Sequence, residues 1–82
     1  MPVELRPEFR QAFLDELLRV ERYVGRQDRR RGRAFTQAVF DFAYSVVGAF
    51  PESFPAYIHP LLPGVQLRRA IFRREYALLY QV

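Results

Sequence analysis

The spacing of apolar residues over most of this chain changes between residues 51 and 64. Before that segment, apolar residues recur every three or four positions over residues 8–24 and 34–50, and after it they alternate with other residues over 65–82. A spacing of three to four produces an apolar stripe on a helix, and alternation places every second side chain on one face of a strand. Helices followed by strands indicate an α+β fold with a helical layer on an antiparallel sheet.

Residues 8–24 are the first predicted helix, and it has one apolar side. Pro7 suits the first turn of a helix, and Gly25 is a natural helix stop. Ahead of this helix, residues 2–6 alternate apolar with charged side chains, which predicts a short half-buried strand. The apolar positions of the helix are Phe9, Phe13, Leu17, Val20 and Val24, with Leu14 and Leu18 beside them.

Residues 34–50 are the second predicted helix, and they carry two apolar lines. One line consists of Phe35, Val39, Phe42, Val46 and Phe50, and the other of Phe40, Tyr44 and Val47. A helix with two apolar lines contacts two sides of one core, or a core and a partner. We therefore expect this helix to be the more central member of a helical hairpin.

The connector between the helices, RQDRRRGR at residues 26–33, holds five arginines around one aspartate. Asp28 is a candidate N-cap for the second helix. The arginines suit either a phosphate-facing patch or a solvated connector and helix start. We favour the connector, because exposed positive charge near a helix N-terminus is only mildly unfavourable.

Residues 51–64 carry four prolines and end in a glycine, so we expect a loop that contains neither helix nor regular strand. His59, the chain's only histidine, lies in this segment. Histidine titrates near neutrality and is a common catalytic base, but no serine, cysteine or carboxylate is spaced to be its partner. We expect a structural or exposed side chain. The loop's expected apolar anchors are Phe54, Tyr57, Ile58, Leu61 and Leu62.

Residues 65–73 and 75–82 are the final two predicted strands. Arg68 is in line with Ala70 and Phe72 on one face of the first strand, and Arg69 and Arg73 are in line with Leu67 and Ile71 on the other. The turn between the strands lacks glycine or asparagine. In the second strand, one face holds Tyr76, Leu78, Tyr80 and Val82. This pattern favours a core-facing strand over an aromatic platform for stacking nucleic-acid bases.

The predicted order is therefore β-α-α-β-β, a helical hairpin packed on a small antiparallel sheet, in one domain spanning residues 1–82. The chain has no cysteine, which excludes disulfides and cysteine metal sites, and we expect neither a metal nor a cofactor. The sequence shows neither the apolar run of a secretory signal peptide nor an apolar stretch as long as a membrane helix, so we expect a cytoplasmic protein without membrane contact. All 13 basic residues are arginine and the net charge is +4, which suits an acidic protein or a polyanion.

The chain resembles the RelE/ParE superfamily, the toxins of type II toxin–antitoxin systems. The likeness covers nearly the whole chain: a short strand, two helices, an FPE turn at residues 50–52, and an ending over residues 63–82 that is similar to the family's GLR…YRLIYRV. The most specific parts are Leu67–Arg68 and the run from Tyr76 to Val82. The resemblance implies a RelE-like fold that lacks the family's last strand. An antitoxin, or a second copy of this chain, would then supply a strand or an apolar helix at the open sheet.

The resemblance implies two activities. ParE-like toxins poison DNA gyrase, and RelE-like toxins are ribosome-dependent mRNA endonucleases. In the nucleases the position after the strand tyrosine is usually arginine, and here Ala77 follows Tyr76. We therefore favour a growth-arresting, ParE-like bacterial toxin that is neutralised by an acidic antitoxin. The alternatives are an mRNA endonuclease acting at the ribosome and a non-toxic interaction module.

The expected contact residues for an antitoxin or target are Arg68, Arg69, Arg73, Arg74 and Tyr80, since arginine pairs bidentately with carboxylates. If the chain were a nuclease, its catalytic candidates would be Arg68, Arg73 and Arg74. The expected assemblies are a toxin–antitoxin hetero-oligomer or a homo-oligomer.

Overall fold

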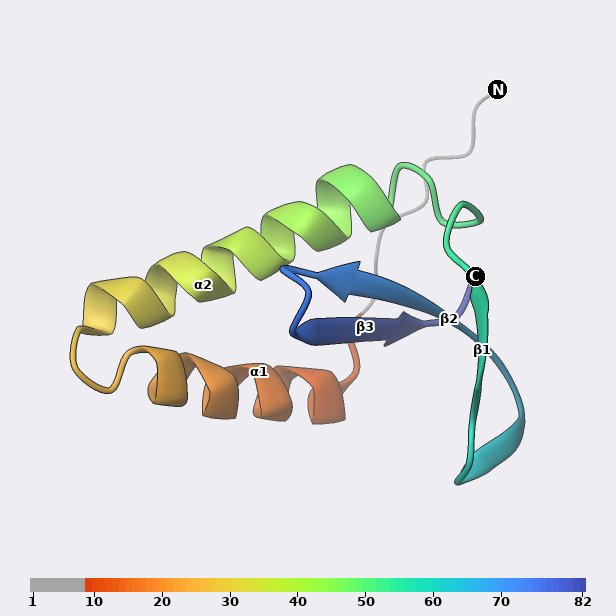
Figure 1. The fold of residues 1–82 in the computed structure, drawn as a ribbon, viewed down its shortest axis with the longest axis horizontal. Coiled ribbons are helices and arrows are strands. Elements are labelled where there is room, and N and C mark those ends of the chain that lie inside the picture. Colours follow the sequence, from red (N-terminus) through yellow and green to blue (C-terminus); the bar gives the residue numbers. More distant parts are fainter. Residues whose placement is uncertain (1–8) are drawn as a thin grey trace.

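The computed structural model describes residues 9–82, and the strand expected at residues 2–6 lies outside them. The helices form a hairpin that packs on a three-stranded antiparallel sheet (Figure 1). The elements in chain order are α1 (Gln11–Val24), α2 (Arg29–Phe42), η1 (Ala43–Val47), β1 (Ala56–His59), β2 (Leu62–Phe72) and β3 (Tyr76–Tyr80). The predicted α+β fold is confirmed for the described residues.

The start of α2 is fixed by Asp28, as predicted. The Asp28 side chain accepts a hydrogen bond from the main-chain N–H of Arg30 at 2.9 Å. The helix therefore begins at Arg29, directly after its N-cap. The expected start at residue 34 followed the first apolar residue of the periodic pattern, and the helix includes five polar or small residues ahead of it. At its other end the helix continues as a π-helix, η1, in which the N–H of Gly48 donates a hydrogen bond to the carbonyl of Ala43, five residues earlier, at 2.8 Å. The helical stretch expected through residue 50 therefore ends at residue 47.

Two glycines bring the ends of α1 and α2 together. A Cβ atom on Gly32 would lie 2.5 Å from the carbonyl oxygen of Glu21 and 3.0 Å from the Cα of Gly25. No real side chain is tolerated at 2.5 Å from a backbone atom, so this approach depends on glycine. The hairpin is therefore tight at its closed end, which Figure 1 places farthest from β1.

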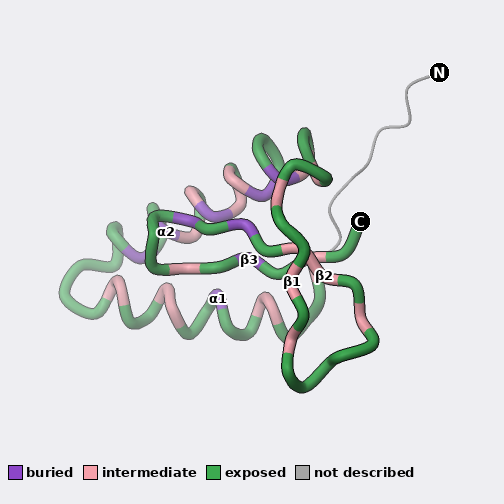
Figure 2. The backbone as a smooth tube through the Cα atoms, turned by 45° about the vertical axis from the view of Figure 1, so that its right-hand side comes forward, coloured by how far each residue is buried: buried purple, intermediate pink, exposed green. Residues whose placement is uncertain are grey.

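The core lies between α2 and one face of the sheet, with α1 contributing from the side (Figure 2). Four of the eight buried apolar residues come from α2 and η1, so the prediction that the second helix is central is confirmed. On β3, Tyr76, Leu78 and Tyr80 face the core as predicted, while Val82 is exposed beyond the strand end. The buried apolar residues are Leu17, Phe35, Val39, Ala43, Val47, Ala70, Phe72 and Leu78.

The segment expected to be a loop, residues 51–64, contains β1 and the first residues of β2, so that prediction is wrong. The strands are compatible with the prolines because of where each proline falls. Pro55 precedes β1 and Pro60 lies in the following turn. Pro63 lies where the register is irregular, since Tyr57 pairs with Leu67 but the next pair is His59 with Leu62. Proline is tolerated at bulges because its missing N–H is not required there.

Candidate functional site

Arg68 and Tyr80 attach the loop before β1 to the sheet. They are register partners across β2 and β3. Arg68 Nη1 donates hydrogen bonds to the carbonyl oxygens of Glu52 (3.0 Å) and Phe54 (2.7 Å). The Tyr80 hydroxyl donates to the carbonyl oxygen of Pro51 (2.5 Å). Burial raises the pKa of Tyr80, against the opposing effect of the Arg68 charge. Two of the predicted contact residues therefore have partners inside the fold.

Arg73 and Arg74 form the turn between β2 and β3. Both have left-handed backbone conformations, with φ of 51° and 66°, which residues other than glycine and asparagine seldom adopt. The Arg73 guanidinium lies over the rings of Phe72 (5.0 Å) and Phe35 (5.8 Å), at the edge of the core. Cation–π attraction holds that charge against the aromatic cluster. The Arg74 side chain is exposed.

Arg69 lies on the opposite face of β2 from Arg68, and its guanidinium lies over the ring of Tyr57 at 5.1 Å. The four sheet arginines therefore lie apart from one another. Arg68 contacts the loop before β1, Arg69 an aromatic ring on the outer face and Arg73 the edge of the core, while Arg74 is exposed in the turn. Charged groups that stabilise a phosphodiester transition state must converge on one point. These arginines do not form such a cluster.

The face of the sheet that points away from the helices carries apolar side chains. We call it the outer sheet face, and it consists of Tyr57, Leu67, Arg69, Ile71, Ala77 and Leu79. Ile71 is 49% exposed and Leu79 is 40% exposed. Sequence reasoning placed the residues of β2 and β3 on the correct face and named Arg69 as a contact residue, but it expected Tyr57 in a loop and missed the apolar residues as a candidate binding surface. The signal was present, since both alternating sets of β3 positions are apolar.

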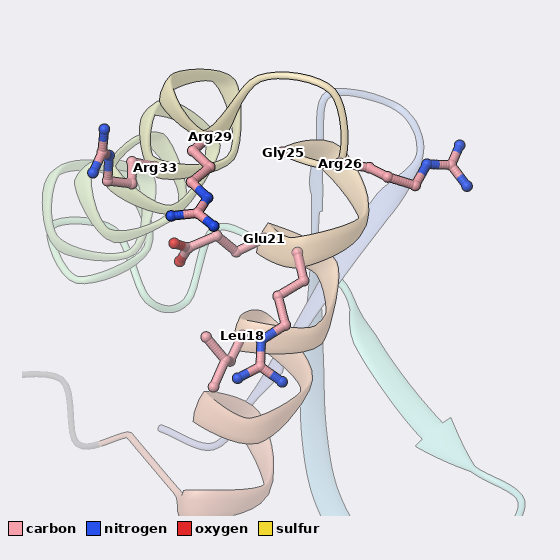
Figure 3. Close-up of a pocket in the computed structure, with 7 residues that line it drawn as sticks. Leu18, Glu21, Gly25, Arg26, Arg29 and Arg33 are labelled. Carbon is pink, nitrogen blue, oxygen red and sulfur yellow. The ribbon is translucent and has the colours of Figure 1, made fainter.

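A hollow of about 440 Å³ lies between α1 and α2 at the closed end of the hairpin (Figure 3). We call it the arginine hollow. Figure 3 shows Arg29 reaching from α2 toward Glu21 on α1, with Arg26 and Arg33 pointing to opposite sides. The Glu21 carboxylate accepts a hydrogen bond from the Thr36 hydroxyl at 2.6 Å. The lining residues are Leu18, Glu21, Arg22, Gly25, Arg26, Arg29 and Arg33.

His59 has a structural partner. Its Nδ1 accepts a hydrogen bond from the main-chain N–H of Leu61 at 3.0 Å, which shapes the turn between β1 and β2. Within residues 9–82, no three side chains of the metal-ligating types gather into a site that could hold a metal ion. This contact agrees with the expectation of a structural or exposed side chain at His59.

Comparison of this chain with protein-family models, with curated proteins and with solved structures gives no match. The likeness to the RelE/ParE superfamily therefore rests on the residues quoted above. Among the helices of the described residues, none combines the length and the apolar composition needed to cross a membrane.

Proposed function

We propose that this chain is the toxin of a type II toxin–antitoxin system, of the ParE-like kind that inhibits DNA gyrase, and that an acidic antitoxin neutralises it. The observation that carries the proposal is the outer sheet face. It presents apolar side chains that no described residue covers, with Ile71 and Leu79 each at least 40% exposed. Exposed apolar patches mark interaction surfaces, protein-binding sites among them.

The chemistry of this surface suits an acidic partner with an apolar face. Arg69 lies within the outer sheet face, and Arg74 lies at its end in the turn. Glu75 is the acidic residue closest to them in sequence. Protein interfaces combine an apolar centre with a polar rim, and arginine pairs bidentately with carboxylates. An amphipathic segment with acidic edges would satisfy both parts of the surface.

The contacts of the sheet arginines support gyrase inhibition over RNA cleavage. Arg68, the nuclease candidate on β2, donates to two main-chain carbonyls. Arg73 is held over two aromatic rings. Ala77, where the nucleases usually have arginine, lies on the outer sheet face opposite Ile71 and supplies only a methyl group. A nuclease needs several donors around one phosphate, and this arrangement provides no such group.

Induced expression of this chain in a bacterial host tests the proposal, with growth, mRNA integrity and the supercoiling of a reporter plasmid followed together. Growth arrest with altered supercoiling and intact mRNA is the expected result. Arrest with fragmented mRNA would favour the endonuclease instead, and normal growth would contradict the toxin proposal and favour a non-toxic module. Coexpression of a small acidic protein encoded beside this chain should restore growth.

A matched pair of variants tests the role of the outer sheet face in neutralisation. Leu79→Gln changes a residue on that face, and Leu18→Gln makes the same change on α1 at a similar exposure of 45%. The first variant should remain toxic but escape the antitoxin, and the second should be neutralised normally. Equal neutralisation of both variants would place the antitoxin elsewhere.

A further inference from the structure

The positive charge of this chain is concentrated at the closed end of the helical hairpin. Residues 21–33 contain six arginines and two carboxylates, a net charge of +4 that equals the net charge of the whole chain. The other seven arginines are balanced by seven carboxylates. Local charge of one sign raises the potential at that surface and attracts polyanions. We call these six residues the arginine end: Arg22, Arg26, Arg29, Arg30, Arg31 and Arg33.

The charges of the arginine end are not neutralised within the described residues. All six side chains are exposed. The ion pair that the structure records for residues 9–82 joins Arg19 to Glu16, outside this group. The two nearby carboxylates accept hydrogen bonds that build the hairpin, Glu21 from the Thr36 hydroxyl and Asp28 from the main-chain N–H of Arg30. Arg29 is directed toward the Glu21 carboxylate (Figure 3), and the other exposed guanidinium groups remain available to an external anion.

This arrangement is unfavourable for the isolated hairpin. The first turn of α2 contains Arg29, Arg30 and Arg31 and no acidic residue. Helix N-termini carry partial positive charge, so cations there are repelled. A bound anion would remove this repulsion and the mutual repulsion of the arginines. From sequence alone a solvated connector was the favoured interpretation of this segment, and the lack of internal neutralisation now favours a binding site.

The geometry gathers the charge from both helices around one recess. The close contact of Gly25 with Gly32 holds the helix ends together. Four of the seven residues lining the arginine hollow are arginines, and they come from α1, the connector and α2 (Figure 3). The Arg26 guanidinium also lies over the exposed ring of Tyr23 at 5.1 Å, which supports its side chain. Arginines from three segments thus line one recess, and Arg26 and Arg33 extend from it to opposite sides, so that the positive charge reaches beyond the hollow itself (Figure 3).

We infer that the arginine end binds the phosphate backbone of a nucleic acid. Protein–protein interfaces have charge-depleted, apolar centres, whereas nucleic-acid interfaces are polar and strongly positive. Arginines make up four of the seven residues that line the hollow, and the exposed Leu18 and Tyr23 lie beside them. Arginine forks match phosphate oxygens, and several such contacts on successive phosphates give sequence-independent binding. The site is separate from the outer sheet face and does not depend on the toxin proposal.

Fluorescence anisotropy with the purified full-length chain tests this inference. The probes are a labelled DNA duplex and a labelled RNA duplex of the same sequence, titrated over a series of KCl concentrations. The test variant is Arg26→Gln with Arg33→Gln. The control variant is Arg69→Gln with Arg74→Gln, which removes the same charge from the sheet end. Far-UV circular dichroism and thermal melting show whether each variant keeps its fold.

The wild-type chain should bind at low salt, and log K should fall linearly with log salt concentration. The test variant should bind more weakly, with a salt slope smaller by about 2, since each lost phosphate contact contributes about 0.9. The control variant should keep the wild-type slope. Tighter binding of DNA or of RNA supports the inference and identifies which of them supplies the phosphates.

Three results would overturn the inference. The first is no binding of either duplex at low salt. The second is an equal loss of affinity in the test and control variants, because net charge alone would then explain binding. The third is displacement of the duplex by poly-glutamate at the same concentration of charge as the duplex itself, which would assign the arginine end to an acidic protein.

Discussion

Arg68 and Tyr80 lie opposite each other on β2 and β3 and donate hydrogen bonds to three carbonyl groups of one loop, at Pro51, Glu52 and Phe54. The loop that leads from η1 into β1 is thereby fixed to the sheet by side chains, in addition to the main-chain hydrogen bond from the Arg69 N–H to the Pro55 carbonyl at 3.0 Å. Arginine can serve two carbonyls at once because its guanidinium carries several fixed donors. The pair therefore positions β1 and, through it, one edge of the outer sheet face.

Replacing Arg68 by glutamine should destabilise the protein. The variant loses charge-assisted hydrogen bonds to two carbonyls, and bonds of this kind contribute about 1.5–3 kcal/mol. In a domain of this size each kcal/mol corresponds to a shift of about 4–8 °C in Tm. Thermal melting followed by circular dichroism measures the change. Arg69→Gln is the control, because it removes the same charge from the neighbouring position of β2 and loses only an exposed cation–π contact with Tyr57, so it should lower Tm less. Equal Tm values for the two variants would show that the loop contacts are not stabilising.

Replacing Tyr80 by phenylalanine should lower the free energy of unfolding by about 1 kcal/mol at neutral pH and also weaken its dependence on alkaline pH. Burial raises the pKa of Tyr80 above its ordinary value of 10.0 in the folded chain. The folded state therefore favours the neutral phenol, so this contribution is complete below pH 10.0 and is lost as the pH rises through the folded-state pKa.

Urea denaturation at a series of alkaline pH values measures this effect. Wild-type stability should decline more steeply than that of the Tyr80→Phe variant. Tyr23→Phe is the control, since Tyr23 is 65% exposed on α1, and it should follow the wild-type curve. Parallel curves for wild type and Tyr80→Phe would contradict the role of the Tyr80 hydroxyl.

The helices and the final hairpin could be predicted from sequence because their apolar spacing is regular and long. The Asp28 cap and the inward face of β3 followed from the same local rules. β1 was missed because its four residues lie among prolines, which normally exclude regular strands. Only the irregular pairing of β1 with β2, a tertiary feature, makes Pro63 acceptable there.

The site was harder to predict than the fold. Alternation placed Arg68 on the same face as Ala70 and Phe72, but charge suggested an exposed ligand contact. The structure instead directs its guanidinium to loop carbonyls 14 and 16 residues away in sequence. Such long-range hydrogen bonds leave no periodic signal. The outward-facing Ile71 and Leu79 did leave a signal in the sequence, because both alternating sets of positions in these strands hold apolar residues.

Replacing Gly32 by alanine should destabilise the hairpin, although alanine normally favours a helix. The new Cβ would lie 2.5 Å from the carbonyl oxygen of Glu21, so α1 and α2 would have to move apart. Overpacking of this kind costs about 1–3 kcal/mol, which exceeds the gain of about 1 kcal/mol expected from helix propensity. Thermal melting measures the outcome. Gly64→Ala is the control, because nothing lies within 4 Å of its Cβ position, and it should be neutral or stabilising. A Gly32→Ala variant more stable than wild type would contradict the close helix contact.

Replacing Arg74 by glycine should stabilise the protein by up to about 1 kcal/mol, because glycine adopts left-handed conformations without steric strain. Arg74 has a φ of 66° in the turn between β2 and β3, directly after Arg73 with a φ of 51°. Urea denaturation measures the gain, and Arg74→Gln separates backbone strain from charge, since glutamine removes the charge but keeps the Cβ. The glutamine variant should show little change. If both variants gain stability equally, relief of charge repulsion with Arg73 is responsible. A gain confined to glycine would show that the left-handed backbone at position 74 is strained by the Cβ atom, independently of the charge.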